Sequence, residues 1–345
     1  MRVAVVLFNL GGPISLDAVE PFLFNLFHDP AIIRVPQPLR WLLATLISKR
    51  RAPVARDIYA KMGGSSPIVG QTQNQAAALK TALNGDGTHF ETFVAMRYAA
   101  PRATDIVEQV KRFRPNKIVL LPLYPQFSTT TTRSSLREWR TVARERELDA
   151  PVATICCYPQ DQGFIAAQAA LIAESVAKLP PNVRFRLLFS AHGLPKKIVA
   201  DGDPYQGQVD KTAKALAEKL HREHLDWRVT YQSRVGPMAW IGPATDEEIK
   251  QAGREGLALV VAPIAFVSEH SETLVELDIE YAKLAAASGV PHYLRVPAVG
   301  THPEFIAGLA SLVRKAAARD GTIPGGGTRL CPVTCKHCAL EGKSA

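Results

Sequence analysis

The 345-residue sequence has no apolar run of the roughly 18–20 residues that a transmembrane helix needs. It also lacks a normal secretory leader, since the start MRVAVVLFNLGGP has one basic residue and an apolar run of only about eight residues. We therefore expect a buried first strand and a cytoplasmic protein. A G-x-G-x-x-G fingerprint is missing as well, because Pro13 follows Gly11 and Gly12. That absence disfavours a dehydrogenase.

Acidic residues are in the minority, with 32 Asp and Glu against 41 Lys and Arg. The net charge of +9 favours nucleic acid, anionic lipid or a small anionic ligand as partner. No RNA- or DNA-binding signature and no long basic block is present, so we rank nucleic acid last. The five cysteines of a cytoplasmic chain should be thiols or metal ligands instead of disulfides.

Short apolar runs alternate with amphipathic stretches along the chain. The predicted strands fall into two sets, 2–10, 90–98, 117–125 and 151–159, then 184–192, 228–236, 257–266 and 292–299. The predicted helices include 70–83, 103–114, 161–178, 207–224 and 301–318. Such alternation is typical of parallel sheets covered on both faces. It predicts an α/β protein with two Rossmann-like, doubly wound domains, each with a four-stranded parallel sheet flanked by helices.

The predicted domain boundaries follow from these two sets of strands. We expect an N-terminal domain over 1–160, a connecting helix over 161–180, a second domain over 181–300, a C-terminal helix over 301–320 that packs back on the first domain, and a cysteine-rich tail over 321–345.

Segment 14–58 replaces a simple crossover helix and is more apolar than one buried helix face needs. It is either a pair of extra core helices with a solvated basic end, or an apolar lip that admits a ligand or touches a membrane surface.

Polar motifs follow several predicted strands. Ligands of open α/β sheets bind beyond the carboxyl ends of the strands, so these motifs should converge on one cleft between the domains. One of them, SAHGLP, places His192 directly after the run RLLFS. A lone histidine is more often a hydrogen-bonded core or loop residue than a ligand, but the end of a strand favours a functional role.

The stretch FVSEHSETLVELDIEY contains four glutamates that share one stripe of a regular helix, at about 100° per residue: Glu269, Glu272, Glu276 and Glu280. Like charges at this spacing repel one another. The stripe is either a solvated face or a row of carboxylates that a cation or protons pass.

The tail contains Cys331, Cys335 and Cys338 in the pattern C-x₃-C-x₂-C. With His337 these cysteines could bind zinc. With one distant cysteine they could hold an iron–sulphur cluster. A tail with free thiols is the third interpretation.

Six motifs in this order resemble ferrochelatase, the terminal enzyme of haem synthesis: FNLGGP, YAKMGGSSPI, LYPQFSTTTTRSS, LFSAHGLP, YQSRVGPMAWIGPATDE and FVSEHSETLVELDIEY. The resemblance covers about residues 3–320. It implies the chelatase fold and insertion of Fe²⁺, a substrate, into protoporphyrin IX with release of two protons. Segment 14–58 matches the family's mobile apolar lip.

The resemblance also implies roles for individual residues. His192, Glu272 and His270 match the catalytic residues, with His192 as the proton acceptor or as an iron ligand. Metal is expected at His192, Glu272, Glu269, Glu276 and Glu280. Porphyrin is expected to contact Leu10, Arg97, Tyr98, Tyr124, Ser128, Thr129 and Trp240.

Many ferrochelatases hold a [2Fe–2S] cluster with three C-terminal cysteines and one from mid-chain. Here the animal mid-chain cysteine aligns with Ala167, which leaves Cys156 and Cys157 as candidates. Neighbours on a strand point to opposite faces, so only one of the two can serve, and we favour Cys157.

Two alternatives to the enzyme stay open, a non-catalytic porphyrin or haem carrier and a chelatase that acts on coproporphyrin III. A carrier needs neither a base nor an acid stripe. The resemblance alone suggests a homodimer, and the lip suggests a peripheral contact with the inner face of the membrane.

Overall fold

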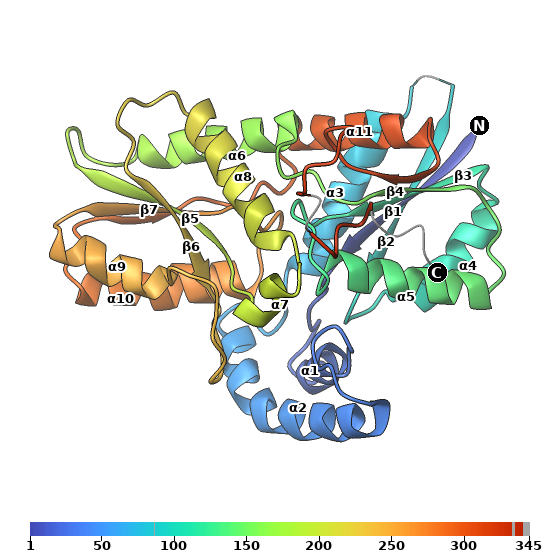
Figure 1. Cartoon of the computed structure of the whole chain (residues 1–345), viewed down its shortest axis with the longest axis horizontal. Coiled ribbons are helices and arrows are strands. Elements are labelled where there is room, and N and C mark those ends of the chain that lie inside the picture. Colours follow the sequence, from blue (N-terminus) through green and yellow to red (C-terminus); the bar gives the residue numbers. More distant parts are fainter. Residues whose placement is uncertain (86, 333–334, 341–345) are drawn as a thin grey trace. The chain divides into compact units, whose positions relative to one another are not determined.

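Figure 1 shows the computed structural model, which describes residues 1–85, 87–332 and 335–340. The chain divides into two compact units. The first unit contains Met1–Cys157 and Leu309–Ile323, and the second contains Tyr158–Gly308 and Pro324–Ala345. Parts of the predicted tail, residues 333–334 and 341–345, lie outside the described residues. The cleft expected between the domains stays a prediction.

The first unit contains a parallel sheet in the order β2-β1-β3-β4-β9. Its strands are β1 (Arg2–Asn9), β2 (His89–Met96), β3 (Lys117–Pro122), β4 (Val152–Ile155) and β9 (Gly321–Ile323). The predicted number of four strands is wrong for this sheet, because β9 pairs with β4 through Ala153 and Gly321. This strand has only three residues and no apolar pattern, so the sequence assigned it to the tail.

Both faces of β1 are buried, as expected for a central strand. Its residues Ala4, Val6 and Phe8 pack in one apolar cluster with α4 (Ala103–Phe113) and α5 (Thr132–Glu145). Helix α3 (Ile68–Leu83) also packs along β2 and β1. Helix α5 was not among the predicted helices, and its Trp139 meets Phe8 edge to face at 5.7 Å.

Segment 14–58 forms two helices, α1 (Val19–Phe27) and α2 (Gln37–Ala60), which are visible below the first sheet in Figure 1. Their inner sides share an apolar cluster that includes Phe22, Leu23 and Tyr98. Helix α2 also exposes large apolar side chains, namely Leu39, Trp41, Leu42, Leu46 and Val54. Part of this segment is therefore core, and part is an exposed apolar surface, while its role as a lip stays a prediction.

The second unit contains the predicted four-stranded parallel sheet, in the order β6-β5-β7-β8. Its strands are β5 (Phe185–His192), β6 (Trp227–Gln232), β7 (Ala258–Pro263) and β8 (Tyr293–Arg295). Its helices are α6 (Gln162–Val176), α7 (Lys196–Ala200), α8 (Tyr205–Lys219), α9 (Thr245–Arg254), α10 (Ala282–Ala287) and the first part of α11 (Pro303–Ala317). Leu188, Leu259 and Val261 form a buried cluster with residues of α9 and α10.

The acidic segment is not a regular α-helix. Residues Glu272–Tyr281 form a π-helix, η1, which continues into α10. Backbone hydrogen bonds of a π-helix span five residues, and such segments are frequent at functional sites. The expectation of 100° per residue is therefore wrong for this stretch. Within the described residues, no helix is long and apolar enough to cross a membrane.

Candidate functional site

His192 is the last residue of β5 and lies opposite Gln232, the last residue of β6. The chain leaves the sheet at Gly193, whose N–H donates to the carbonyl oxygen of Gln232 at 2.9 Å. A Cβ atom at position 193 would lie 3.0 Å from that oxygen and 3.4 Å from Cε3 of Trp240. Glycine at 193 therefore permits the turn that leaves the His192 ring 38% exposed.

Glu272, the first residue of η1, meets His192 directly. Nδ1 of His192 lies 2.9 Å from Oε2 of Glu272. A carboxylate only accepts hydrogen bonds, so Nδ1 carries the hydrogen and Nε2 is the nitrogen that can face a ligand. The two residues are 80 positions apart in the sequence. The structure thus brings His192 and Glu272 into direct contact within the second unit.

His270 approaches the same carboxylate oxygen from another direction. Its Nε2 lies 3.8 Å from Oε2 of Glu272, while its Nδ1 lies 3.1 Å from the carbonyl oxygen of Ser268. The carbonyl accepts, so Nδ1 carries a hydrogen. A proton taken up on Nε2 would therefore face the negative charge of Glu272.

The charges of His192, Glu272 and His270 shift the pKa values of His192 and Glu272 in opposite directions. Burial lowers the pKa of His192, but the charge and hydrogen bond of Glu272 outweigh it, so the pKa ends above its ordinary value of 6.5. Burial raises the pKa of Glu272, but His192 and His270 together hold it well below the usual range. Relative to isolated side chains, the pairing therefore favours the protonated form of His192 and the ionised form of Glu272.

Glu276 is the next acid of η1 and sits in a dense set of donors. Its Oε1 accepts from the Ser233 N–H at 2.8 Å and from the Tyr281 hydroxyl at 3.0 Å. Its Oε2 accepts from the Gln232 amide and the Ser233 hydroxyl. The same Gln232 amide donates to the backbone carbonyl of Glu272 at 3.0 Å. Gln232 thus links the two acids.

The pKa of Glu276 is raised, because burial and the charge of Glu272 together exceed the effect of these donors. Of the two linked acids, Glu276 therefore takes up a proton at the higher pH. The pair offers a strong anion at Glu272 and a weaker acid one helical turn away.

The other two predicted acids are placed differently. Glu269 precedes η1, and its Oε1 accepts from Arg295 and from the backbone N–H of Ala298 at 2.9 Å. Arg295 also pairs with Asp278. Glu280 lies near the end of η1 on the exposed side. The four glutamates are therefore not one continuous row.

Trp240, one of the predicted porphyrin contacts, lies beside the His192 turn. Its backbone forms a bridge with Pro195, three residues after His192. The indole is partly buried, and its Nε1 has no hydrogen-bond partner among the described residues.

The porphyrin-contacting residues predicted in the first unit surround the ends of β1 and β2. The N–H of Tyr98 donates to the carbonyl of Leu10 at 3.0 Å. Tyr98 itself is 1% exposed, and its hydroxyl donates to Asp29 at 2.8 Å. Arg97 also contacts Asp29, with Nη2 at 2.8 Å.

The loop before α5 contains the remaining predicted contacts. Ser128 and Thr129 are almost fully buried, whereas Tyr124 is partly buried. The Ser128 hydroxyl lies 2.9 Å from that of Thr130, so it shapes the loop itself.

Gln232, Ser233 and Asp29 were missed by sequence reasoning. The first two lie inside the quoted motif YQSRVGPMAWIGPATDE and within the predicted strand 228–236. The strand ends earlier than predicted, at Gln232, so the sequence did not mark these two residues as a strand end. Asp29 follows a very apolar segment, and only its contacts reveal its importance.

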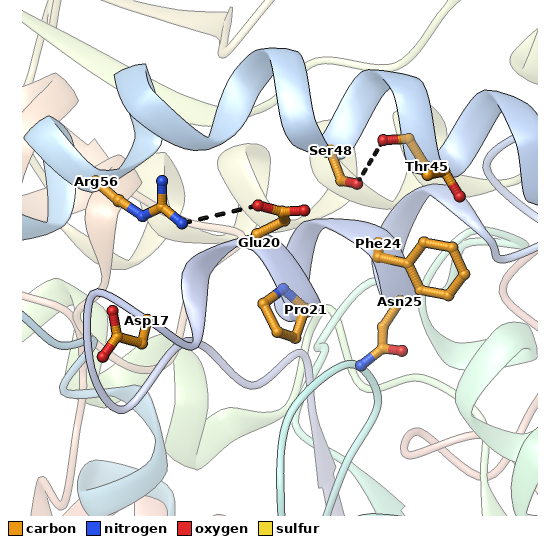
Figure 2. A pocket seen from close by; sticks show the side chains of 8 residues that line it. All are labelled: Asp17, Glu20, Pro21, Phe24, Asn25, Thr45, Ser48 and Arg56. Atoms are coloured by element: carbon orange, nitrogen blue, oxygen red, sulfur yellow. Dashed lines mark hydrogen bonds and ion pairs between the residues drawn. The ribbon is translucent and has the colours of Figure 1, made fainter.

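A separate groove of about 450 Å³ lies between α1 and α2 (Figure 2). Its lining residues are Asp17, Glu20, Pro21, Phe24, Asn25, Thr45, Ser48 and Arg56. Figure 2 shows Arg56 reaching toward Glu20, and the two form an ion pair at 3.8 Å. None of the predicted site residues lines this groove, so it is distinct from the candidate site.

The cysteines do not assemble in the described part of the chain. No three His, Cys, Asp or Glu side chains of residues 1–85, 87–332 and 335–340 form a group able to hold a metal ion. The argument that only one of Cys156 and Cys157 can serve is wrong in its premise. Strand β4 ends at Ile155, and the two Sγ atoms lie 3.7 Å apart.

Comparisons with known proteins agree with the geometry. A family model described as Ferrochelatase matches residues 2–317. A Ferrochelatase of Phenylobacterium zucineum is 52% identical over 343 residues, covering 99% of this chain and 98% of the relative. A Ferrochelatase of Pelagibacter ubique is 51% identical over 317 residues, covering 91% of each chain.

Solved structures confirm the fold class. SirB from Bacillus subtilis with Fe³⁺ superposes with a TM-score of 0.57 at 14% identity, covering 92% of this chain and 96% of SirB. The sirohydrochlorin chelatase SirB in complex with cobalt gives a TM-score of 0.55 at 11% identity, with the same coverage. At such low identities the likeness shows the fold alone.

Proposed function

The chain belongs to the ferrochelatase family and inserts Fe²⁺ into protoporphyrin to form haem, and we propose that His192 is the base that accepts the pyrrole protons. A free-base porphyrin is a flat ring with two N–H groups, and its lone pairs point into the ring plane. Metal entry requires that the ring bends and that both protons leave. A base within hydrogen-bond reach of the ring must therefore accept them.

The contact between His192 Nδ1 and Glu272 Oε2, at 2.9 Å, carries this proposal. It fixes the tautomer in which neutral His192 presents a basic Nε2. It also stabilises the imidazolium that forms when Nε2 accepts a proton. The raised pKa of His192 expresses that stabilisation and makes Nε2 a stronger base.

We infer that protons leave the site through Glu272, His270 and the linked acid Glu276. His270 Nε2 faces Glu272 at 3.8 Å, a distance that one water molecule or a small shift can bridge. The raised pKa of Glu276 makes it a suitable next acceptor, because a carboxylate with a very low pKa would not hold a proton.

The alternative is that the same residues bind metal instead of protons. His192 and Glu272 would then bind the incoming Fe²⁺, which would pass along Glu269, Glu276 and Glu280. Glu269 already pairs with Arg295. Glu276 accepts four hydrogen bonds from protein donors. A cation would have to displace these partners, so the contacts favour protons over iron for these two acids.

For the porphyrin we propose contacts with Leu10, Arg97, Tyr98, Tyr124, Ser128, Thr129 and Trp240. Trp240 supports this assignment best, because its partly buried indole lies next to the His192 turn. A flat aromatic ring can stack on a tetrapyrrole and help to distort it. The partly exposed Tyr124 can contribute in the same way.

The exposed apolar side of α2 supports a peripheral membrane contact. Trp41 is 51% exposed and Leu46 is 58% exposed. Such side chains insert into the boundary between lipid headgroups and acyl chains. We propose a cytoplasmic protein that touches the inner face of the membrane through this surface, and a homodimer as its assembly.

The proposed [2Fe–2S] cluster has the weakest support. Cys331 is buried and accepts a hydrogen bond from the Gln208 amide at 3.2 Å, and Cys338 is buried as well. The described residues do not form a ligand group, so their arrangement does not fit an assembled cluster with Cys157, Cys331, Cys335 and Cys338. We route no step of the reaction through it. The visible spectrum of protein purified without oxygen tests the assignment, since a colourless preparation contradicts it.

Anaerobic mixing of the protein with Fe²⁺ and a porphyrin, followed by absorbance, tests the function. We expect His192→Ala to lower the metallation rate by about 10²–10⁴-fold, the usual contribution of a general base. Porphyrin binding should persist. Full turnover by His192→Ala would refute the assigned base.

The same assay separates the alternative functions. Faster metallation of coproporphyrin III than of protoporphyrin would favour the alternative substrate. Binding without any metallation by the unmodified protein would favour a carrier.

A further inference from the structure

Asp29 lies just beyond the end of α1 and contacts two predicted porphyrin-binding residues of the first unit, Arg97 and Tyr98. Its side chain is 0% exposed. It lies in the connection between α1 and α2, yet it has partners just after β2 and in α5, far along the sequence. No sequence pattern assigned it a role.

The contacts of this carboxylate are with hydrogen-bond donors. Oδ2 accepts from Arg97 at 2.8 Å, from the Tyr98 hydroxyl at 2.8 Å and from the Ser134 hydroxyl. Oδ1 accepts from the backbone N–H of Ala31 at 2.8 Å and from Arg137 at 3.0 Å. One buried anion therefore fastens three segments of the chain.

A carboxylate in this place is stable only because it is paired. Burial raises the pKa of Asp29, but Arg97, Ser134, Ala31 and Tyr98 outweigh it, so the pKa ends below its ordinary value. Removing one partner of a buried charge network leaves the others unpaired, which is far more disruptive than losing a surface ion pair.

Arg97 is also held on its other side. Its Nη1 lies 3.1 Å from Glu138, its Nε donates to Ser134 at 2.8 Å, and its guanidinium lies 4.8 Å from the centre of the Tyr98 ring. Its side chain is only 11% exposed. A guanidinium bound by two carboxylates is not a free partner for the propionates of a substrate.

We propose that Asp29 is a positioning residue that locks Arg97 and Tyr98 to the α1–α2 segment and so sets the shape of the porphyrin-binding wall. This inference rests on the proposed function, because it assumes that these residues form that wall. In this arrangement Arg97 is a structural part of the wall and not the propionate-binding residue. A second hydrogen bond also joins α1 to Tyr98, since the Asn25 amide donates to the carbonyl of Tyr98 at 3.0 Å.

Asp29→Asn tests the proposal with the least change in shape. The new amide turns one acceptor into a donor that faces Arg97, Tyr98 and Ser134. We expect the KM for porphyrin, and the Kd from quenching of protein fluorescence, to rise by about tenfold. The kcat should stay within about threefold of the unmodified protein, because the His192–Glu272 pair lies in the other unit.

Asp226→Asn is the matched control. Asp226 also accepts from a buried arginine, Arg186, at 2.9 and 3.0 Å, but it lies at the start of β6, at the opposite end of this strand from Gln232. Its KM should not change. Ser134→Ala is the second variant, in case Asp29→Asn does not fold. It removes one donor and should raise the KM by about threefold.

Loss of folded protein lowers the apparent kcat and leaves KM unchanged, so the split between the two constants separates positioning from plain destabilisation. An unchanged KM in folded Asp29→Asn, or in Ser134→Ala, overturns the proposal. Failure of the proposed function is seen separately, because the unmodified protein would then not metallate porphyrin.

Discussion

Substitution of Gly193 by alanine tests how the chain presents His192. The glycine follows His192 directly, and its N–H already donates to the carbonyl of Gln232 at 2.9 Å. The added Cβ would lie 3.0 Å from that carbonyl oxygen, 3.3 Å from Cγ of Arg234 and 3.4 Å from Cε3 of Trp240.

The size of the effect follows from these three contacts. The φ of Gly193 is not in the left-handed region, so alanine brings no backbone strain. The Arg234 side chain is flexible and can move away. The Gln232 carbonyl cannot, because β6 is hydrogen-bonded to β5 and Gln232 is fully buried. We expect overpacking to lower the free energy of unfolding by about 1–3 kcal/mol.

The metallation rate should fall more than stability suggests. Relief of the contact must move residue 193 or Trp240, and both adjoin His192. A displacement of about 1 Å at a catalytic group can lower the rate by about 10²-fold. Urea denaturation followed by circular dichroism measures the stability, and the anaerobic metallation assay measures the rate.

Gly207→Ala is the control for this substitution. Gly207 lies in the first turn of α8, and nothing lies within 4 Å of an added Cβ. Alanine there should stabilise the helix by about 0.5 kcal/mol and leave the rate unchanged. If Gly193→Ala matches Gly207→Ala in both measurements, the turn is not constrained as described.

Three further predictions concern other parts of the molecule. Glu272 raises the pKa of His192 above 6.5, so kcat/KM should rise with pH as His192 loses its proton. The variant Glu272→Gln should move this rise to lower pH. A pH–rate profile that does not move would contradict the pairing. Arg295→Gln breaks the ion pair with Glu269 and should lower the free energy of unfolding by about 3–5 kcal/mol in urea denaturation. A decrease of less than about 1 kcal/mol would show that the pair contributes little to stability. Trp41→Ser should weaken co-sedimentation with anionic vesicles by about tenfold, because burial of the side chain in lipid contributes about 1.5–3 kcal/mol. The variant should leave metallation in solution unchanged. Equal sedimentation of variant and unmodified protein would exclude the α2 surface as the membrane contact.

The strands of both sheets were predictable where they are long and central. Strand β5 was expected over 184–192 and spans Phe185–His192, because a strand buried on both faces needs a continuous apolar run. Strand β9 was not predictable, because Gly321–Ile323 gains its pairing partner only in the folded chain. Local composition shows that 321–323 is not helical, but it cannot show which edge it joins.

The site was predictable in its chemistry more than in its geometry. The meeting of His192 and Glu272 followed from the ends of predicted strands and from the resemblance. The π-helix did not, because Glu272–Tyr281 has the composition of an ordinary helix. The role of Asp29 was not predictable either. Its hydrogen bonds with residues far along the sequence form only in the folded chain.

The acids of the η1 region have different tasks because their neighbours differ, although their side chains are identical. Glu269 faces Arg295 and is a structural ion pair. Glu272 faces two imidazoles and is held as an anion. Glu276 is buried beside Glu272 and takes up a proton more readily than a free glutamate. In the proposed proton route Glu272 comes first as an anion, and Glu276 follows as the acid with the higher pKa.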